Sequence, residues 1–426
     1  MEAHGVTRAL VRVGLGMMAV PVLLYGVLLA INWRDEPPSD AALRLTAMLE
    51  SRPRIDDAAN GYVHLLGLAL PRDVDALAIG AQRQRWLATY EGPAGTFAAT
   101  WFPDGLPDTR ASMTPEAKAL VAACSDAPTD CTGELVRERA ALDRWLASEA
   151  WRLERYRRML ATRTWRETVP RDWRAPTPGY AAAMHVQELH LLATHMRAVD
   201  GDAETVRAWL EADLAFWRGV VASADLLVTR RIAEAAVKRH FQHGTVALRA
   251  LPPGAREAAT PDAWRRPLDP RERSLMRALA GEWYHTTHST RLLNETASDA
   301  PLGRRISSAL MNPLWKRQAS ANRSAARHLA IGLASEAPRP QAEAELRRLS
   351  KTWSDEHRPF RAYDPLGHLV DGVSIAALYA NRLEGPDEIE RARLDALDGL
   401  GTRSGTTAMA RPMHARPVIT AGNASP

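Results

Sequence analysis

Apolar side chains recur every three or four positions along most of this chain, from about residue 40 to about residue 398. Alternating β-branched runs are scarce, and alanine, leucine, arginine and glutamate dominate. A spacing of three to four places apolar side chains on one face of a helix, whereas half-buried strands need alternation. The pattern therefore predicts an all-α protein, built as an irregular multi-helix bundle or array.

Capping residues and helix breakers give the expected boundaries. Thr114-Pro115-Glu116 and Asp269-Pro270 each place a capping side chain before a first-turn proline. Proline-rich and glycine-rich segments interrupt the apolar pattern elsewhere. We expect helices over residues 40–52, 75–90, 115–123, 133–162, 180–199, 203–226, 228–250, 270–292, 306–334, 339–353, 369–382 and 386–398, with a short strand or an ordered loop over 97–102.

The strongest single feature is the uncharged apolar stretch from Val13 to Ile31. At about 1.5 Å per residue, a helix of this length spans just under the roughly 30 Å of hydrocarbon in a bilayer. The alternative is a cleaved signal peptide, but its apolar core is normally shorter, and no small-x-small cleavage site follows Ala30. We therefore expect an uncleaved signal anchor, with a cytoplasmic tail at residues 1–12 and a transmembrane helix at 13–33.

The orientation of this anchor is less clearly encoded. Arg8 and Arg12 precede the span, but three further arginines follow it by residue 52, so the positive-inside rule is poorly satisfied. The N-terminal tail is short and lies beside its arginines, which favours a cytoplasmic N-terminus. The chain is then a single-pass protein of the bacterial inner membrane. Residues 34–400 form a helical periplasmic domain with a candidate subdivision near 251–268, and the polar segment 401–426 is a disordered tail.

The two cysteines lie close together in "CSDAPTDC", at positions 124 and 131. An oxidising periplasm would let Cys124 and Cys131 form a disulfide. Closing so short a loop stabilises the fold by roughly 2.5 kcal/mol on the chain-entropy model. The alternative is half of a metal site, but the Cys-x2-Cys spacing and a second cysteine pair are both missing.

Composition excludes several functional classes. Hydrophobic residues make up 46% and charged residues 25% of the chain, which is the balance of a globular protein. The formal net charge is only +5, and no basic block or nucleic-acid motif is present, so we expect no nucleic-acid partner. The chain contains no Gly-x-Ser-x-Gly elbow, no Ser-x-x-Lys and no Gly-rich phosphate loop. No catalytic residue can therefore be assigned from a motif.

Three histidines and a glutamate share the stretch "MHVQELHLLATHM". On a helix, His185 and Glu188 lie on or beside the apolar side, His195 lies near that edge, and His190 points away. The following helix has Asp213 in the middle of its apolar stripe, and the two helices should pack antiparallel. Asp213 can then face His185 or Glu188 in a metal or acid/base site. The interpretation we favour is a buried ion pair or hydrogen bond that fixes how the helices meet.

A second cluster lies in "GEWYHTTHST". Glu282 and His285 are three apart, which is the Glu-x-x-His spacing of helical metal pairs. One such pair needs a second half, which the sequence does not identify, so a solvated or partly buried histidine face is the favoured interpretation. His240 and His243 are expected near a helix end, where histidine interacts well with the helix dipole.

The chain has thirteen tryptophans. Most of them should fill wide gaps between irregular helices. Trp165 and Trp173 lie in or beside a broken segment with charged neighbours, so we expect them to be the most exposed. An exposed indole can stack on a ligand or anchor a protein partner.

Three segments carry a resemblance to known sequences: "RLERYRRML" at 152–160, "DLAFWRGVVASADLLVTRRIA" at 213–233 and "FRAYDPLGHLV" at 360–370. They resemble stretches of an uncharacterised group of single-pass, helix-rich envelope proteins of Gram-negative bacteria. The resemblance implies an envelope location and a helical fold, and it implies no activity.

The sequence thus predicts a membrane-anchored periplasmic protein that acts by binding or scaffolding in the cell envelope. Its expected partners are the inner membrane and an envelope protein. We expect no cofactor. One alternative is a metal-dependent envelope hydrolase that uses a divalent metal at the His/Glu/Asp cluster. Another is a helical domain that binds a small ligand.

Overall fold

The computed structural model describes residues 19–92, 102–109, 119, 131–293, 300–356, 361–370 and 383–401. Within these ranges the chain forms α-helices and short 3-10 helices and no strand, which confirms the all-α prediction. Cys124, the predicted helix at 115–123 apart from residue 119, most of the predicted helix at 369–382 and the tail from residue 402 lie outside the described residues.

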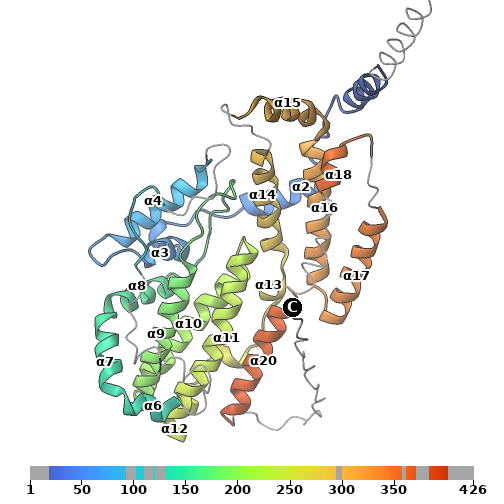
Figure 1. Cartoon of the computed structure of the whole chain (residues 1–426). Coiled ribbons are helices and arrows are strands. Elements are labelled where there is room, and N and C mark those ends of the chain that lie inside the picture. The colour runs from blue at the N-terminus through green and yellow to red at the C-terminus, as the bar shows by residue number, and fades with distance from the viewer. Residues whose placement is uncertain are drawn as a thin grey trace, which may run out of the picture.

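The larger group of helices surrounds α11 (Leu227–Ala250), which contacts α9 (Tyr180–Val199), α10 (Ala203–Ser223) and α20 (Glu384–Gly399) (Figure 1). The other members of this group are α3 (Gly61–Leu68), α4 (Ala76–Thr89), α6 (Cys131–Arg137), α7 (Arg139–Ser148), α8 (Ala150–Ala161), α12 (Pro253–Ala259), α13 (Pro270–Arg273), η1 (Asp57–Ala59) and η2 (Asp262–Arg265).

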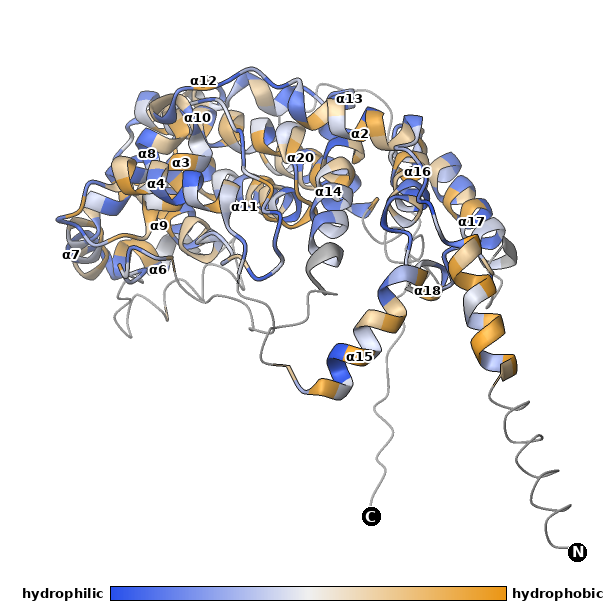
Figure 2. Cartoon of the chain, turned by 90° about the horizontal axis from the view of Figure 1, so that it is seen from above, coloured by the Kyte–Doolittle hydropathy of each residue, from blue (hydrophilic) through white to orange (hydrophobic). Residues whose placement is uncertain are grey.

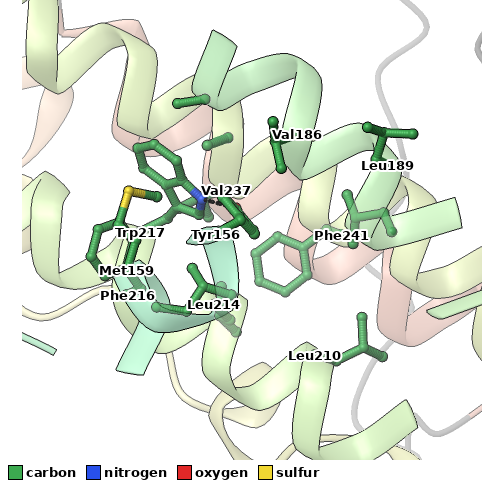
Figure 3. Close-up of a cluster of buried hydrophobic side chains, with 14 of the residues drawn as sticks. Tyr156, Met159, Val186, Leu189, Leu210, Leu214, Phe216, Trp217, Val237 and Phe241 are labelled. Carbon is green, nitrogen blue, oxygen red and sulfur yellow. Dashed lines mark hydrogen bonds between the residues drawn. The ribbon is translucent and has the colours of Figure 1, made fainter. Parts of the chain in front are cut away.

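The core of this group lies where α8, α9, α10 and α11 meet (Figure 3). Leu210, Leu214 and Trp217 project from the apolar stripe of α10, and none of them is more than 1% exposed. They pack with side chains of the neighbouring helices such as Tyr156 and Phe241. Each large side chain buried in this way contributes about 1.5–3 kcal/mol, so this contact fixes the arrangement of the four helices.

The smaller group consists of helices around α14 (Met276–Leu293) and α16 (Arg317–Ser335), which contact each other and α2 (Asp40–Glu50) (Figure 1). Two further apolar clusters hold this group together. Helix α14 also contacts α11, and therefore connects the two groups. The remaining members are α15 (Leu302–Met311), η3 (Asn312–Leu314), α17 (Arg339–Glu356) and α18 (Pro365–Val370).

Residues 19–31 form an apolar N-terminal helix that projects away from the bundle (Figure 2). Most of its large side chains are exposed, for example Leu23 at 70%. Among the described residues, no helix combines the length and the apolar character needed to cross a membrane. Residues 13–18 of the predicted span lie outside the described residues.

The polar segment 35–39 is bound to α16. Asp35 accepts hydrogen bonds from the backbone N–H groups of Gln318 (2.9 Å) and Ala319 (3.1 Å) in the first turn of α16. The side chain of Asn322 accepts from the backbone N–H of Ser39 at 2.9 Å. Since Lys316 at the N-cap of α16 supplies no capping bond, Asp35 satisfies N–H groups that the helix leaves open.

Seven predicted helices agree with the structure to within three residues at each end: α2, α4, α9, α10, α11, α17 and α20. Three long predictions were wrong because each contains an internal break. Residues 133–162 form three helices that break at Glu138 and Glu149, where no proline or glycine marks the break. Residues 306–334 break at Trp315 and Lys316, where the backbone is extended, just after Pro313, which lacks an N–H donor. Residues 270–292 break near Ser274.

Candidate binding cleft

Asp213 lies at the centre of a buried hydrogen-bond network and not beside His185 or Glu188. Its carboxylate accepts hydrogen bonds from the Tyr156 hydroxyl (2.6 Å), the Gln187 side-chain amide (3.2 Å) and Nδ1 of His240 (2.9 Å). Asp213 and His240 are both fully buried. The predicted partners of Asp213 were therefore wrong, although the favoured type of interaction, a buried hydrogen-bonded pair between helices, is the one observed.

Two tryptophans close the network at its ends. The indole N–H of Trp217 donates to the Tyr156 hydroxyl at 2.8 Å, and that of Trp264 donates to Nε2 of His240 at 2.9 Å. An indole nitrogen only donates, so Nε2 of His240 must accept and Nδ1 carries the proton that faces Asp213. Both ring nitrogens of His240 are occupied, and neither is available to a metal or a substrate.

The position of His240 also corrects the sequence prediction. His240 lies in the middle of α11, where it faces α10 and η2, and not near a helix end. Burial alone would raise the pKa of Asp213, but the hydrogen bonds that it accepts from His240 and Tyr156 lower it. Asp213 is thus held as a carboxylate inside the protein.

The histidines of α9 are more deeply buried than the sequence indicated. His190 is 1% and His195 3% exposed, because α8, α10 and α11 all pack on α9. Burial lowers the pKa of each of these two rings to about 4. The prediction that His190 points away from the apolar side was wrong, because α9 has apolar contacts on more than one side.

His185 and Glu188 remain at the edge of α9, where Nδ1 of His185 lies 3.9 Å from the Glu188 carboxylate. Burial lowers the pKa of His185 and raises that of Glu188, so both groups tend toward their neutral forms. Within the described part of the chain, no three His, Cys, Asp or Glu side chains are grouped as a metal site would require. The five metal candidates, all of which are described, therefore do not converge.

Glu282 and His285 instead meet Trp173 in a cleft of about 280 Å³ between the two groups of helices. The indole of Trp173 is 44% exposed, as predicted. The wall is aromatic, aliphatic and proline-rich. The full lining comprises Tyr62, Leu87, Thr168, Pro170, Trp173, Ala175, Pro176, Thr177, Pro178, Tyr180, Leu226, Val228, Glu282 and His285.

Helix α14 reaches this cleft because Gly281 lets it approach the start of α11. A Cβ atom at position 281 would lie 1.6 Å from the carbonyl oxygen of Asp225. The next residue, Glu282, accepts a hydrogen bond from the backbone N–H of Leu227 at 2.9 Å. One turn on, Nδ1 of His285 donates to the carbonyl oxygen of Pro170 at 2.7 Å.

A second acidic side chain, Glu167, also binds the N-terminus of α11. It accepts from the backbone N–H groups of Asp225 and Leu226 and from the hydroxyl of Thr229. Tyr180, in the cleft wall, lies 2.5 Å from that hydroxyl. Burial and the nearby Asp225 raise the pKa of Glu167 to about 8. Glu167 and Glu282 together cap α11, whose own N-cap residue, a leucine, provides no capping side chain.

Two arginines lie against Asp225, which precedes α11. Arg52 pairs with Asp225 and also donates to the carbonyl oxygen of Trp165 at 2.6 Å. Arg277 lies 3.1 Å from the other Asp225 oxygen. Burial raises the pKa of Asp225, and both arginines oppose that shift. These charged groups do not line the cleft, but they form a polar network beside its lining residues Leu226 and Glu282.

The prediction that Trp165 is exposed was wrong. Its side chain is 4% exposed, and it packs edge-on against Tyr62 at a centroid distance of 5.4 Å. The charged neighbours suggested a surface position, but Arg166 donates to the carbonyl oxygen of Pro53 and leaves the indole inside. Trp165 therefore supports the cleft wall and does not form it.

Sequence reasoning missed Glu167, Asp225 and Tyr180. Each lies in or beside a break between helices, and no spacing links Glu167 to the backbone of Asp225, 58 residues later, just before α11. The one available signal was the leucine-rich start of α11, which has no capping side chain of its own and so requires caps from elsewhere.

Comparison of the whole chain with protein-family models, curated proteins and solved structures finds no match.

Proposed function

We propose that this protein is a membrane-anchored binding module of the cell envelope and that the cleft at Trp173 is its binding site. The observation that carries the proposal is the cleft itself, where an exposed indole meets Glu282 and His285, each held by a hydrogen bond to a backbone group. An exposed aromatic side chain in a hollow with a few fixed polar groups is the usual composition of a binding site.

The cleft favours a partner that inserts a single side chain. Its volume of about 280 Å³ is close to the lower limit of small-molecule sites, roughly 300–1,000 Å³. The indole and the prolines suit an apolar group, and the Glu282 carboxylate suits a donor or a cation at its tip. An aromatic or long basic side chain of an envelope protein has this chemistry.

The exposed apolar N-terminal helix supports the membrane part of the proposal. We propose that residues 13–33 anchor the chain in the inner membrane, that the helical domain lies in the periplasm, and that Cys124 and Cys131 form a disulfide there. Reporter fusions at the C-terminus test the orientation, since an alkaline phosphatase reporter is active only in the periplasm.

The alternative of a metal-dependent hydrolase has no grouped ligands among the described residues to support it. The alternative of a small-ligand site would use the same cleft. A small molecule that copurifies with the wild-type chain and is lost in Trp173→Ala would support that alternative.

Photocrosslinking in cells tests the proposal. Val228 lines the cleft and is 47% exposed, whereas Val136 is equally accessible at 51% but lies on α6. Each is replaced in turn by p-benzoylphenylalanine in the full chain. We expect one discrete protein adduct from position 228 that is absent from position 136 and is lost when Trp173→Ala is added. Adducts that are alike at both positions, or that persist in Trp173→Ala, would show that the cleft is not the binding site.

A further inference from the structure

Helix α15 carries an apolar stripe that the described part of the chain leaves uncovered. Leu302, Ile306 and Leu310 follow one another at intervals of four, so they share one face. They are 68%, 51% and 49% exposed, and no residue of α15 is buried. Three large aliphatic side chains exposed in a row mark a face that binds a partner.

This stripe lies beside the predicted anchor. The hydroxyl of Tyr25 in the N-terminal helix donates to the carbonyl oxygen of Leu310 at 2.8 Å. Val20, Leu23 and Leu24 of the same helix are more than half exposed. Figure 2 shows α15 and the N-terminal helix projecting from the same side of the molecule, both with hydrophobic residues along their length. The two helices therefore place their exposed apolar groups at one end of the protein.

The position of the Tyr25–Leu310 hydrogen bond along the N-terminal helix suits an α15 that lies in the membrane interface. Tyr25 lies six residues before Ile31, where the N-terminal helix ends, or about 9 Å along the axis. Interfacial helices bury their apolar face about 5–10 Å into the boundary between headgroups and acyl chains. Trp33, which is 81% exposed, lies just beyond the helix, where an interfacial tryptophan belongs.

The charge around the stripe favours an anionic surface. From Pro301 to Arg317 the sequence has basic residues at Arg304, Arg305, Lys316 and Arg317 and no acidic residue. Arg304 lies opposite the apolar stripe on a helical wheel. Basic residues on the polar side of an amphipathic helix bind anionic lipid headgroups.

The junction between anchor and domain is rigid enough to hold α15 in place. Asn32, which is 2% exposed, donates from its side-chain amide to the carbonyl oxygen of Ala362 at 2.7 Å. Its side-chain oxygen accepts from the backbone N–H of Asp364 at 2.8 Å. The bonds of Asp35 to the start of α16 extend this connection. The N-terminal helix is thus fixed to the group of helices from which α15 extends.

We propose that α15 lies in the membrane–water interface, with its apolar stripe among the acyl chains and its arginines at anionic headgroups. The helix would then act as a second contact with the bilayer and hold the domain in one orientation on the membrane. This inference rests on the proposed membrane anchor, and the experiment separates the two.

The experiment uses the full chain, reconstituted into vesicles of phosphatidylethanolamine and phosphatidylglycerol. In one protein p-benzoylphenylalanine replaces Ile306 on the stripe, and in a matched control it replaces Ser307, which is exposed but lies off the stripe. After illumination, mass spectrometry measures lipid adducts at each position. We expect several-fold more lipid adduct at position 306 than at position 307.

Two outcomes would overturn the inference. Equal lipid adducts at both positions, in protein that floats with the vesicles, would show that the anchor stands and that α15 does not enter the interface. Adducts between two copies of the chain at position 306 would show that the stripe is a self-association surface. Protein that fails to float would contradict both the anchor and the inference.

A charge reversal provides a second test. Arg304→Glu with Arg305→Glu should lower the lipid adduct at position 306 several-fold in vesicles that contain phosphatidylglycerol. In vesicles of phosphatidylcholine alone, the two proteins should give the same yield. A reversal without effect on anionic vesicles would contradict the role of the arginines.

Discussion

The Asp213 carboxylate accepts a hydrogen bond from Nδ1 of His240 at 2.9 Å, and neither side chain is exposed to solvent. With Tyr156 and two tryptophans this pair forms a continuous chain of hydrogen bonds from α8 through α10 and α11 to η2. A histidine paired with an aspartate is often a catalytic arrangement, but here Trp264 occupies the other ring nitrogen. The pair therefore fixes the packing of helices.

Asp213→Ala should destabilise the protein by about 3–5 kcal/mol, because it leaves Tyr156 and His240 buried without their acceptor. Asp143→Ala is the matched control, since Asp143 pairs with Arg139 at the surface and should contribute less than about 1 kcal/mol. Urea titration of the full chain in mild detergent, followed by tryptophan fluorescence, measures both. Equal losses would show that the network does not hold the helices together.

The buried histidines of α9 predict a loss of stability in acid. The pKa values of His190 and His195 are lowered to about 4 in the folded protein, below the usual 6.5. The unfolded chain therefore binds protons that the folded chain does not, and stability falls as the pH falls from about 6.5 to about 4. The slope is about 1.4 kcal/mol per pH unit for each ring.

His195→Gln should reduce this slope, and His64→Gln, which changes a partly exposed ring on α3, should leave it unchanged. The free energy of unfolding, measured at several pH values between 4 and 7 for the three proteins, gives the comparison. A wild-type stability that does not change over this range would contradict the burial of neutral rings.

Most helices could be predicted because the signals that specify them lie within the helix or next to it in the sequence. The apolar stripe of α10 and the first-turn proline of α13 each follow from neighbouring residues. Helix α3 was missed because nearly all of its residues are buried, so its sequence "GYVHLLGL" shows no polar face and no helical period. The break at Glu149 was missed because no proline or glycine marks it in the sequence.

The candidate site was harder to predict because its parts meet only in the folded chain. The spacing of Glu282 and His285 correctly indicated a shared helix face. They bond to backbone groups of Leu227 and Pro170, and no third ligand joins them among the described residues. Asp213 was correctly expected to have a buried partner. Which histidine it faces depends on how α10 packs between α9 and α11, and that is decided by side chains spread over the whole core.

Glu167 should make stability fall as the pH rises, which is opposite to the effect of the buried histidines, and Glu167→Gln should remove this effect. The folded pKa of Glu167, about 8, exceeds the usual 4.5, so the folded chain keeps a proton that the unfolded chain releases. Its contribution is full below about pH 4.5 and is lost as the pH rises through about 8, at about 1.4 kcal/mol per pH unit. Glutamine imitates the protonated acid and removes this dependence.

The comparison is cleanest between pH 6.5 and 8.5, where His190 and His195 are neutral in the folded protein. Wild-type stability should decline over this interval relative to Glu167→Gln. Glu154→Gln, a change in an exposed pair with Arg158, is the control and should run parallel to the wild type. If the wild-type and Glu167→Gln curves run parallel, Glu167 is ionised in the folded protein throughout this interval.

Gly281→Ala should destabilise the protein by about 3 kcal/mol, because its Cβ would lie 1.6 Å from the carbonyl oxygen of Asp225 and the backbone must shift to admit it. The shift would also move Glu282 and His285 away from the cleft.

Gly219→Ala is the matched control. Gly219 lies in the interior of α10, and no atom lies within 4 Å of the position that its Cβ would take, so the added methyl should stabilise the helix by about 0.5–1 kcal/mol. Thermal unfolding of the full chain measures both changes, and crosslinking from position 228 reports the cleft. A Gly281→Ala protein with wild-type stability and wild-type crosslinking would show that α14 does not approach α11 this closely.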